Sequence, residues 1–364
     1  MNILTIIDYL STSGPSYVAI RTAEALVNAG HKVSFLVLYH DVSIIIDPRI
    51  TIKTLKLKST KHYRLKYTKA VHDYVKKLEG TSSIDLILVH LSHSIHLMKT
   101  YPHQYVFHYI HNTLSKESTD TYSFIKGQFK LYKLRRQLKG LNLIAVSKGV
   151  QDDALNIVKL KPKSIQTIYN PIDIHTIQKL ANNNHNIKYQ DYIIHIGRFV
   201  SQKRHDRLIR AYLQSNINGK LLLIGQGPLK EQSKELVSTL GLTDNVIFHD
   251  QLQNPYPFIK NAKLLILSSD YEGLGFVLLE ALALQTPIIS TDCPHGPKEI
   301  FKNYISENLI AIDDEDALAR QIHKVYTHPD DYIPDHSCIN PFTYTAIAKK
   351  FELLIKTTDI DSFN

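Results

Sequence analysis

The feature that most constrains the fold is an alternation of short apolar runs with helical patterns along most of the chain. Ile3–Ile7 and Lys32–Tyr39 have the composition of strands, and Val18–Ala29 between them has a helical pattern that stops at Gly30. Strands that alternate with helices form parallel sheets covered by those helices. The alternation therefore predicts an α/β fold. The other predicted strands are Leu86–His90, Tyr105–Ile110, Leu143–Val146, Tyr192–Ile196, Lys220–Ile224, Val246–Phe248, Lys263–Leu267 and Pro287–Ser290, and the other predicted helices are His205–Gln214, Leu229–Leu240, Phe276–Leu284 and Glu315–Val325.

The chain has 364 residues, which is too long for one ordinary hydrophobic core. Ile168–Asp173, followed by the polar stretch Ala181–Asn186, predicts a linker and places the domain boundary near residue 172. We expect residues 1–172 and 173–340 to form two Rossmann-like domains. Residues 341–364 are expected to add a C-terminal helix that could pack back on the first domain.

Composition excludes several classes of protein. No apolar run approaches the roughly 20 residues that span a bilayer. The N-terminal run Met1–Asp8 has no basic region and reaches an acid quickly, so we interpret it as a first strand and not a signal peptide. Two cysteines, Cys293 and Cys338, cannot form a disulfide framework, which favours a reducing cytoplasm.

The net charge of +9 is concentrated in the first half of the chain. Lys53–Lys77 contains nine Lys and Arg residues with a single acid, and Lys126–Lys139 contains six with no acid. Three interpretations stay open: a solvated basic face, a docking surface for anionic lipid headgroups, and a nucleic-acid site. Nucleic acid is the weakest of these, because no helix-turn-helix, zinc-finger or RNP-like pattern accompanies the charge.

Ser268–Glu280 is the segment with the clearest chemistry. Glu272 and Glu280 lie on either side of a Gly273-Leu274-Gly275 turn that opens a predicted helix. A helix N-terminus offers unpaired backbone N–H groups and a partial positive charge, which suit an anion or a cluster of hydroxyls. The segment predicts a polyhydroxylated, phosphorylated ligand, and a capped helix with two solvated glutamates is the competing interpretation.

Cationic residues and turns rich in glycine and proline follow other predicted strands of the second half. Arg198 ends one strand and Lys203 lies five residues further on; two such cations can neutralise a diphosphate without a metal. Gly225-Gln226-Gly227-Pro228 follows the next strand, and the Pro/Gly-rich loop Thr291–Glu299 follows a later one. The first strand leads to a loop with Gly14 that lacks Gly-x-Gly-x-x-Gly, so a nicotinamide dinucleotide site is not expected.

The histidines do not predict a metal site. His90, His93 and His96, and the pair His108 and His111, lack both zinc-ligand spacing and cysteine partners. Asp313–Asp316 is interpreted as an acidic N-cap of the following helix in preference to a cation site.

In family order, these motifs resemble the retaining, GT-B-fold glycosyltransferases of the GT4 type, also called glycosyl transferases group 1. The loop Thr291–Glu299 is similar to that of a subgroup that builds bacterial surface glycans. The resemblance implies two Rossmann-like domains whose parallel sheets face a central cleft, with acceptor bound by residues 1–172 and nucleotide sugar bound by residues 173–340. Many relatives carry Gly-Gly where this chain has Gly14-Pro15.

The resemblance also implies roles for individual residues. Arg198 and Lys203 would hold the donor diphosphate and stabilise its developing charge. Glu272 and the backbone of the turn would bind sugar hydroxyls, Glu280 would bind the ribose, and His111 would reach the sugar from the first domain. The implied catalytic residues are Arg198, Lys203, Glu272 and His111, and the implied donor-binding residues are Gly14, Gly197, Gly227, Gly273, Leu274, Gly275, Phe276 and Glu280.

The implied reaction moves a hexose or N-acetylhexosamine, with retention of configuration, from a nucleotide sugar to a glycan hydroxyl. UDP is the expected carrier, and the expected acceptor belongs to lipopolysaccharide, lipooligosaccharide, capsule or lipid-linked oligosaccharide synthesis. Neither a metal nor a cofactor is expected. Two alternatives stay open: an epimerase or hydrolase of the same fold that acts on the donor alone, and a non-catalytic nucleotide-sugar-binding or nucleic-acid-binding protein. The resemblance also implies a cytoplasmic location, with the inner face of the cell membrane as a surface that the basic clusters could bind.

Overall fold

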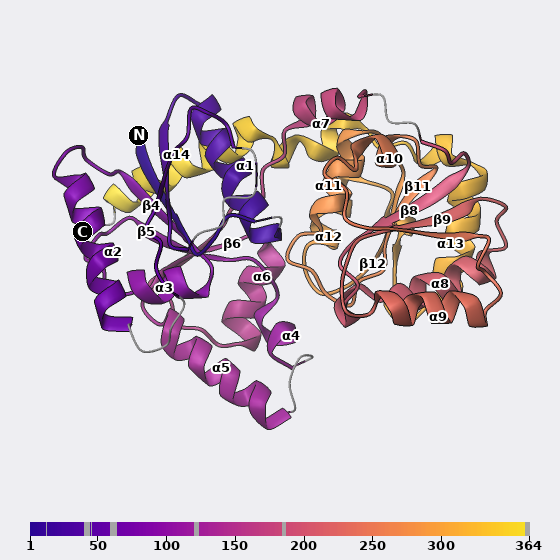
Figure 1. Cartoon of the computed structure of the whole chain (residues 1–364), viewed down its shortest axis with the longest axis horizontal. Coiled ribbons are helices and arrows are strands. Elements are labelled where there is room, and N and C mark those ends of the chain that lie inside the picture. The colour runs from indigo at the N-terminus through magenta and orange to yellow at the C-terminus, as the bar shows by residue number, and fades with distance from the viewer. Residues whose placement is uncertain are drawn as a thin grey trace. The chain divides into compact units, whose positions relative to one another are not determined.

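A computed structural model describes residues 1–11, 13–39, 44, 46–58, 64–119, 124–183 and 187–360. The chain divides into two compact units, residues 1–171 with 342–364, and residues 172–341. Each unit is a parallel sheet covered by helices (Figure 1). The prediction of an α/β fold built from two Rossmann-like domains is confirmed.

The first unit contains a seven-stranded parallel sheet in the order β3-β2-β1-β4-β5-β6-β7. Its central strands are buried on both faces, which is why they appear in the sequence as nearly continuous apolar runs. The strand order reverses between β1 and β4, and ligands of such sheets bind beside the carboxyl ends of strands at that point. The strands are β1 (Asn2–Ile7), β2 (Lys32–Val37), β3 (Thr51–Thr54), β4 (Leu86–His90), β5 (Val106–Ile110), β6 (Asn142–Ala145) and β7 (Ser164–Thr167).

The helices of the first unit include one from the far end of the chain. This helix, α14, packs against α1: the Tyr344 hydroxyl donates to Glu24 Oε2 at 2.5 Å, and His31 Nε2 lies 3.1 Å from Glu352 Oε1. The segment predicted as a C-terminal helix therefore completes the first unit; residues 361–364 lie outside the described residues. The helices are α1 (Gly14–Asn28), α2 (Arg64–Glu79), α3 (Ser92–Met98), α4 (Leu114–Thr119), α5 (Phe124–Leu138), α6 (Lys148–Asp152), the π-helical turn η2 (Asp153–Ile157) and α14 (Tyr344–Ile360).

The second unit contains a six-stranded parallel sheet in the order β10-β9-β8-β11-β12-β13. Its strand order reverses between β8 and β11, which makes the carboxyl ends of these two neighbours the expected ligand position. The strands are β8 (Tyr192–Ile196), β9 (Lys220–Ile224), β10 (Val246–His249), β11 (Leu264–Leu267), β12 (Ile288–Thr291) and β13 (Leu309–Ile310).

Helices of the second unit begin just after the loops that follow the strands. The Asp314 carboxylate accepts a hydrogen bond of 2.7 Å from the Ala317 backbone N–H, so the acidic N-cap predicted for Asp313–Asp316 is confirmed. The helical elements are α7 (Ile174–Ala181), η3 (Ser201–Lys203), α8 (His205–Ser215), α9 (Lys230–Thr239), α10 (Tyr256–Lys260), α11 (Phe276–Ala283), α12 (Pro297–Ile300), α13 (Glu315–Thr327) and the short turns η4 (Phe301–Asn303), η5 (Ser306–Asn308) and η6 (Pro329–Tyr332); a further turn, η7 (His336–Phe342), leads into the first unit.

Parts of the fold differ from the sequence-based expectation. The edge strands β3, β7 and β13 were not predicted: β13 has only two residues, and the sequences of β3 and β7, Thr-Ile-Lys-Thr and Ser-Ile-Gln-Thr, alternate polar residues and stay partly exposed. The polar stretch Ala181–Asn186 is not at the boundary between the units, because the chain already enters the second unit at Ile172 and forms α7 before it. Residues 184–186 of that stretch lie outside the described residues. Within the described part of the chain, none of the helices combines the length and apolar character that crossing a membrane requires.

Candidate active site

The loops that follow β8, β9, β11 and β12 lie along one edge of the second sheet, because these strands are parallel and adjacent. The order of the strands brings together loops that are far apart in sequence: those after β8, β9 and β11 contain residues predicted for the site, and the one after β12 is the Pro/Gly-rich loop Thr291–Glu299. This edge is therefore the candidate donor-binding site.

Glycines allow the first two of these loops to pack directly on each other. A Cβ atom at Gly225 would lie 2.0 Å from the Gly197 carbonyl oxygen, and one at Gly227 would lie 2.4 Å from the Phe199 carbonyl oxygen. The Gly197 N–H donates to the Ile224 carbonyl at 3.0 Å, which ties the two loops together. Both glycines of the Gly225-Gln226-Gly227 loop are thus required by backbone packing.

The turn from Gly273 to Phe276 is shaped by two residues in the left-handed region. Gly275 has φ +85° and forms the N-cap of α11, where no side chain caps the first turn. Gly296, with φ +79°, lies so close to Leu274 that a Cβ atom there would be 2.5 Å from the Leu274 Cα. The loop after β12 therefore holds the turn in place. The N-terminus of α11, whose N-cap is a glycine, can receive hydroxyl or phosphate oxygens.

The structure brings Lys203 and Glu272 together, although 69 residues separate them. Lys203 Nζ lies 2.5 Å from Glu272 Oε1, with side-chain exposures of 19% and 9%. The same carboxylate oxygen accepts a hydrogen bond of 2.6 Å from the Ser269 hydroxyl. The ammonium and the carboxylate therefore neutralise each other at the junction of two neighbouring strand ends.

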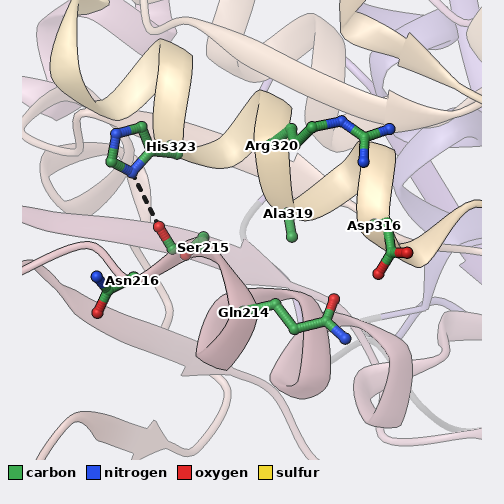
Figure 2. A pocket seen from close by; sticks show the side chains of 7 residues that line it. All are labelled: Gln214, Ser215, Asn216, Asp316, Ala319, Arg320 and His323. Atoms are coloured by element: carbon green, nitrogen blue, oxygen red, sulfur yellow. Dashed lines mark hydrogen bonds between the residues drawn. The ribbon is translucent and has the colours of Figure 1, made fainter.

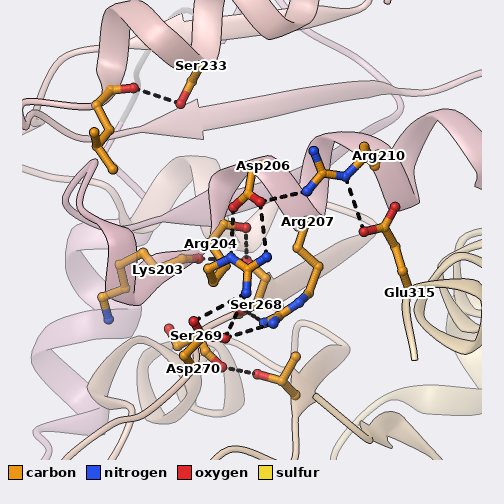
Figure 3. A network of polar contacts seen from close by, with 12 residues as sticks. Lys203, Arg204, Asp206, Arg207, Arg210, Ser233, Ser268, Ser269, Asp270 and Glu315 are labelled. Carbon is orange, nitrogen blue, oxygen red and sulfur yellow. Dashed lines mark hydrogen bonds and ion pairs between the residues drawn. The ribbon is translucent and has the colours of Figure 1, made fainter. Parts of the chain in front are cut away.

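A network of polar contacts fixes this junction (Figure 3). Arg207, only 4% exposed, donates from Nη1 to the Ser268 carbonyl at 2.9 Å and from Nη2 to Asp270 Oδ1 at 2.7 Å. The Ser268 hydroxyl donates to the Lys203 carbonyl at 2.9 Å. Arg204, in the left-handed region at φ +48°, contacts the Asp270 carboxylate at 3.2 Å. The network holds the Lys203 loop against the Glu272 loop.

The aspartate on the helix side of this network stays ionised. Burial raises the pKa of Asp206, but hydrogen bonds from Arg204 and Arg210 outweigh it and lower that pKa to about 2. Arg210 extends the network to Glu315 at 3.3 Å. None of these residues was predicted for the site. Their only sequence signal is the density of arginine and aspartate just after Lys203, at Arg204, Asp206, Arg207 and Arg210.

Arg198 differs from Lys203 in its surroundings. It is exposed at the end of β8, and in the described part of the chain no hydrogen bond or ion pair engages its guanidinium group. Glu280, the predicted ribose ligand, is half-buried on α11 and accepts a hydrogen bond of 3.1 Å from the Tyr256 hydroxyl. The site therefore offers one open cation, one paired cation and two partly engaged carboxylates.

Two buried histidines lie beneath the Lys203 loop. His195 Nδ1 lies 2.9 Å from the Ile266 carbonyl oxygen and so donates its proton across β8 and β11. Burial lowers the pKa of His195 to about 4. Burial, together with the neighbouring His195 and Lys203, lowers the pKa of His205 to about 2. The His205 ring stacks on Phe199 with ring centroids 4.0 Å apart. Both imidazoles are neutral at pH 7 and support the Gly197–Phe199 backbone.

In the first unit, His111 follows β5 at the carboxyl edge of its sheet. His111 Nε2 lies 3.1 Å from Nδ1 of His90, which ends the neighbouring strand β4. Burial lowers the pKa of His111 to about 3 and that of His90 well below its usual value. This edge therefore presents a neutral imidazole. Gly14 is the first residue of α1. A Cβ atom added there would have no atom within 4 Å, so the space around this residue is open.

Two buried carboxylates that the sequence did not single out support the same edge. Asp8, after β1, accepts hydrogen bonds of 2.6 Å from the backbone N–H and the hydroxyl of Ser94 at the start of α3. Asp153 accepts from the Ser115 backbone N–H at 3.1 Å and from its hydroxyl, which fixes α4 just after His111. These aspartates hold helix starts beside the strand ends.

A hollow of about 550 Å³ lies elsewhere on the second unit, between α8 and α13 (Figure 2). It is lined by the last turn of α8, where the Ser215 carbonyl lies 2.9 Å from His323 Nδ1. The Lys203 loop precedes the first turn of the same helix. None of the predicted site residues lines this hollow.

Two Rossmann-like units, with glycine turns and cations at adjacent strand ends of the second, define the class of GT-B-fold glycosyltransferases. The family described as Glycosyltransferase Family 4 matches residues 12–176, and the family described as Glycosyl transferases group 1 matches residues 177–340. The chain therefore belongs to the GT4-type, group 1 glycosyltransferases.

Individual relatives are named for surface-glycan enzymes. The chain is 30% identical over 172 residues to a Campylobacter jejuni N-acetylgalactosamine-N,N'-diacetylbacillosaminyl-diphospho-undecaprenol 4-alpha-N-acetylgalactosaminyltransferase, covering 47% of each chain. It is 28% identical over 187 residues to the lipopolysaccharide 1,6-galactosyltransferase of Salmonella typhimurium, covering 47% of this chain and 49% of that protein. The chain thus spans about half the length of these curated relatives. The structure of Anabaena HepE in complex with UDP and glucose has the same fold, with a TM-score of 0.76 and 16% identity over 98% of this chain and 100% of that one.

Proposed function

We propose that the protein is a retaining glycosyltransferase that moves a hexose or N-acetylhexosamine from a nucleotide sugar to a hydroxyl of a surface-glycan acceptor. The observation that carries this proposal is the Lys203–Glu272 ion pair of 2.5 Å, which joins the end of η3 to the loop that leads to α11. A phosphate-binding cation and a hydroxyl-binding carboxylate in direct contact suit a ligand in which a sugar is bonded to a diphosphate.

Arg198 and Lys203 act as the electrostatic catalysts in this proposal. When the donor binds, its phosphates take up the open Arg198 guanidinium group and share the Lys203 ammonium with Glu272. The two cations then stabilise the negative charge that accumulates on the departing diphosphate. Because they supply the positive charge, the reaction needs neither a metal ion nor a cofactor.

Glu272 and Glu280 position the donor. Glu272 accepts hydrogen bonds from sugar hydroxyls while Ser269 holds its carboxylate in place. Glu280, held by Tyr256, binds the ribose hydroxyls. Backbone N–H groups from Gly273 to Phe276 complete the sugar site, and Gly14 allows its loop to approach the phosphates.

The pKa of His111 fits a hydrogen-bonding role and not a proton-transfer role at pH 7. A neutral imidazole can contact a sugar hydroxyl without adding positive charge next to an oxocarbenium-like transition state. The acceptor hydroxyl attacks from the face that the diphosphate leaves, and the departing phosphate takes the proton of that hydroxyl. The configuration at the anomeric carbon is thereby retained.

The names of the relatives support the substrate class. They describe transfer to an undecaprenol-linked saccharide and to lipopolysaccharide, and the HepE complex contains UDP and glucose. We therefore propose a UDP-sugar donor and a lipid-linked or lipopolysaccharide-type acceptor. A cytoplasmic location agrees with the two buried cysteines, which are free thiols.

Acceptor-dependent turnover tests the proposal. The protein is incubated with a panel of UDP- and GDP-sugars, with and without a lipid-linked oligosaccharide, and product configuration is measured by NMR. We expect an α-linked product from an α-linked donor, turnover that EDTA leaves unchanged, and loss of turnover in Lys203→Ala but not in the surface control Lys234→Ala. Donor hydrolysis at a rate that no acceptor changes would instead identify a hydrolase.

A further inference from the structure

One side of helix α5 (Phe124–Leu138), labelled in Figure 1, packs on the first unit. Gly127, Leu131, Leu134 and Leu138 follow the spacing i, i+4, i+7, i+11 and therefore lie on one side of the helix. Leu131 and Leu138 are buried, and a Cβ atom at Gly127 would lie 2.9 Å from the Ser118 carbonyl oxygen of α4. This face attaches α5 to the first unit.

A second set of residues with the same spacing begins at Ile125, two residues before Gly127, and lies on the opposite face of α5. Ile125, Phe129, Tyr132 and Arg136 form this outer stripe, with exposures of 80%, 58% and 51% for the first three. Eight large hydrophobic residues are exposed in the described part of the chain, and three of them are on this stripe. A solvated helix face carries polar residues at such positions, so the outer stripe has the composition of a contact surface.

The charge around the outer stripe is entirely positive. Residues 124–139 contain six Lys and Arg residues and no acid. Lys133 Nζ lies 4.5 Å from the centre of the Phe129 ring, and the Arg136 guanidinium lies 6.0 Å from that of Tyr132. Exposed apolar side chains and cations are thus interleaved on one side of one helix.

These properties decide between partners. A second copy of the chain would bring another helix face whose charged residues are all positive against the first, which electrostatic repulsion opposes. Nucleic acid would pair with the cations and stack on Phe129 but would gain little from Ile125, an aliphatic side chain with 80% exposure. An anionic bilayer surface accommodates all of them: aliphatic and ring carbons enter the acyl boundary, the Tyr132 hydroxyl stays among the headgroups, and the cations pair with phosphates.

We propose that the α5 outer stripe docks this protein on the surface of an anionic bilayer. Helix α5 contacts α4, where Lys130 Nζ donates to the Glu117 carbonyl at 3.2 Å, and α4 follows directly after His111. Docking therefore holds the predicted acceptor edge of the first unit close to the lipid. The use of this placement for lipid-linked acceptors rests on the proposed transferase function, whereas the docking itself does not.

The chain contains no tryptophan, so the Phe129→Trp variant carries a single fluorescent reporter on the stripe. We expect its emission to shift to the blue with vesicles of phosphatidylcholine and phosphatidylglycerol, and to stay unchanged with phosphatidylcholine alone. The Leu213→Trp variant, at a 42% exposed position on α8, is the matched control and should not shift. A Phe129→Trp emission that shifts with single-stranded DNA but not with anionic vesicles would overturn the proposal in favour of nucleic acid.

Flotation with the same vesicles separates the apolar and cationic contributions. The Ile125→Ser/Phe129→Ser double variant should lower the partition coefficient on the order of a hundredfold, and Lys126→Glu/Lys133→Glu should lower it by at least roughly tenfold. The controls Leu213→Ser and Lys349→Glu should float as the wild type does. Undiminished flotation of the Ile125→Ser/Phe129→Ser variant would refute insertion of the stripe.

The outcome for docking is independent of the outcome for transfer. The α5 variants should keep their turnover with a water-soluble acceptor, whereas Lys203→Ala should lose turnover and still float with anionic vesicles. Loss of vesicle binding with intact turnover on the soluble acceptor thus concerns docking alone. Absence of turnover in the wild type, with normal flotation, would contradict only the transferase proposal.

Discussion

Lys203 Nζ and Glu272 Oε1 lie 2.5 Å apart, although they belong to loops after different strands, β8 and β11. The contact depends on the strand order. Strands β8 and β11 are neighbours because the chain adds β9 and β10 on one side of β8 and then returns to add β11 on its other side. A charge pair at this position has two separable roles, one in stability and one in ligand binding.

Replacing either partner should reveal both roles. Lys203→Ala removes the ammonium group that lies 2.5 Å from the Glu272 carboxylate, which is only 9% exposed, so we expect a loss of about 1–3 kcal/mol in the free energy of unfolding. Turnover should fall roughly 10²–10³-fold because the leaving diphosphate loses a cation. Urea unfolding and steady-state kinetics measure the two effects. A Lys203→Ala/Glu272→Gln double variant should recover stability but not turnover; recovery of turnover would contradict the role of Lys203.

The arginine network should matter for KM and stability together. Asp270→Ala removes the carboxylate partner of Arg207, whose side chain is 5% exposed, and we expect a destabilisation of about 2–4 kcal/mol. The donor KM should rise because the Lys203 loop is no longer fixed to the Glu272 loop. Asp250→Ala is the control, because that aspartate is solvent-exposed and pairs with Lys230 at the surface. Equal unfolding midpoints for the two variants would show that the network does not stabilise the fold.

Stability should fall as pH drops below about 6.5. Burial lowers the pKa values of His111, His195 and His205 to about 3, 4 and 2, whereas in the unfolded chain these side chains bind protons near the ordinary histidine pKa of 6.5. Their contribution is complete above pH 6.5 and is lost as the pH falls toward those folded-state values. Each such histidine adds a slope of up to about 1.4 kcal/mol per pH unit.

A single variant tests this slope. His205→Phe keeps a ring against Phe199 and removes one titrating group. The slope of the unfolding free energy against pH, between roughly pH 4.5 and 6, should therefore decrease by the contribution of one histidine, up to about 1.4 kcal/mol per pH unit. Urea unfolding at several pH values provides the measurement. An unchanged slope would mean that His205 is not held neutral in the folded protein.

Alanine at Gly225 should change stability, whereas alanine at Gly14 should change donor binding. Gly225→Ala places a Cβ atom 2.0 Å from the Gly197 carbonyl oxygen, and we expect a destabilisation of about 1–3 kcal/mol from overpacking. Gly14→Ala meets no atom within 4 Å, so the unfolding midpoint should change little while the donor KM rises if the loop approaches phosphate. Thermal unfolding and donor titration distinguish the two. A donor KM unaffected by Gly14→Ala would remove Gly14 from the site.

The sequence predicted those parts of the fold that depend on local pattern. Strands such as Leu86–His90 and Lys220–Ile224 were predicted with their observed bounds, because continuous apolar runs are the signature of strands buried on both faces. The edge strand Thr51–Thr54 was missed because half of its residues face solvent and it has no such run. The local sequence Gly273-Leu274-Gly275, followed by an apolar run, also predicted the turn at Gly275.

The contacts of the site could not be predicted in the same way. The Lys203–Glu272 pair, the Arg207–Asp270 contact and the His195–Ile266 hydrogen bond all join the segment from β8 to the start of α8 to β11 and its following loop. Each spans more than sixty residues, and only the strand order makes them neighbours. The sequence predicted candidate residues for the site. Their contacts with one another could be known only from the order of the strands in the sheet.

The position of α14 has a consequence for how the protein is made and degraded. The first unit contains segments that precede and follow the second unit, with Tyr344 and Glu352 of α14 bonded to α1 and to the loop after it. During synthesis, that unit stays incomplete until the ribosome has translated the whole second unit and released α14. A premature stop or a protease cut after residue 341 would thus leave the later-made unit intact and deprive the earlier-made one of a helix.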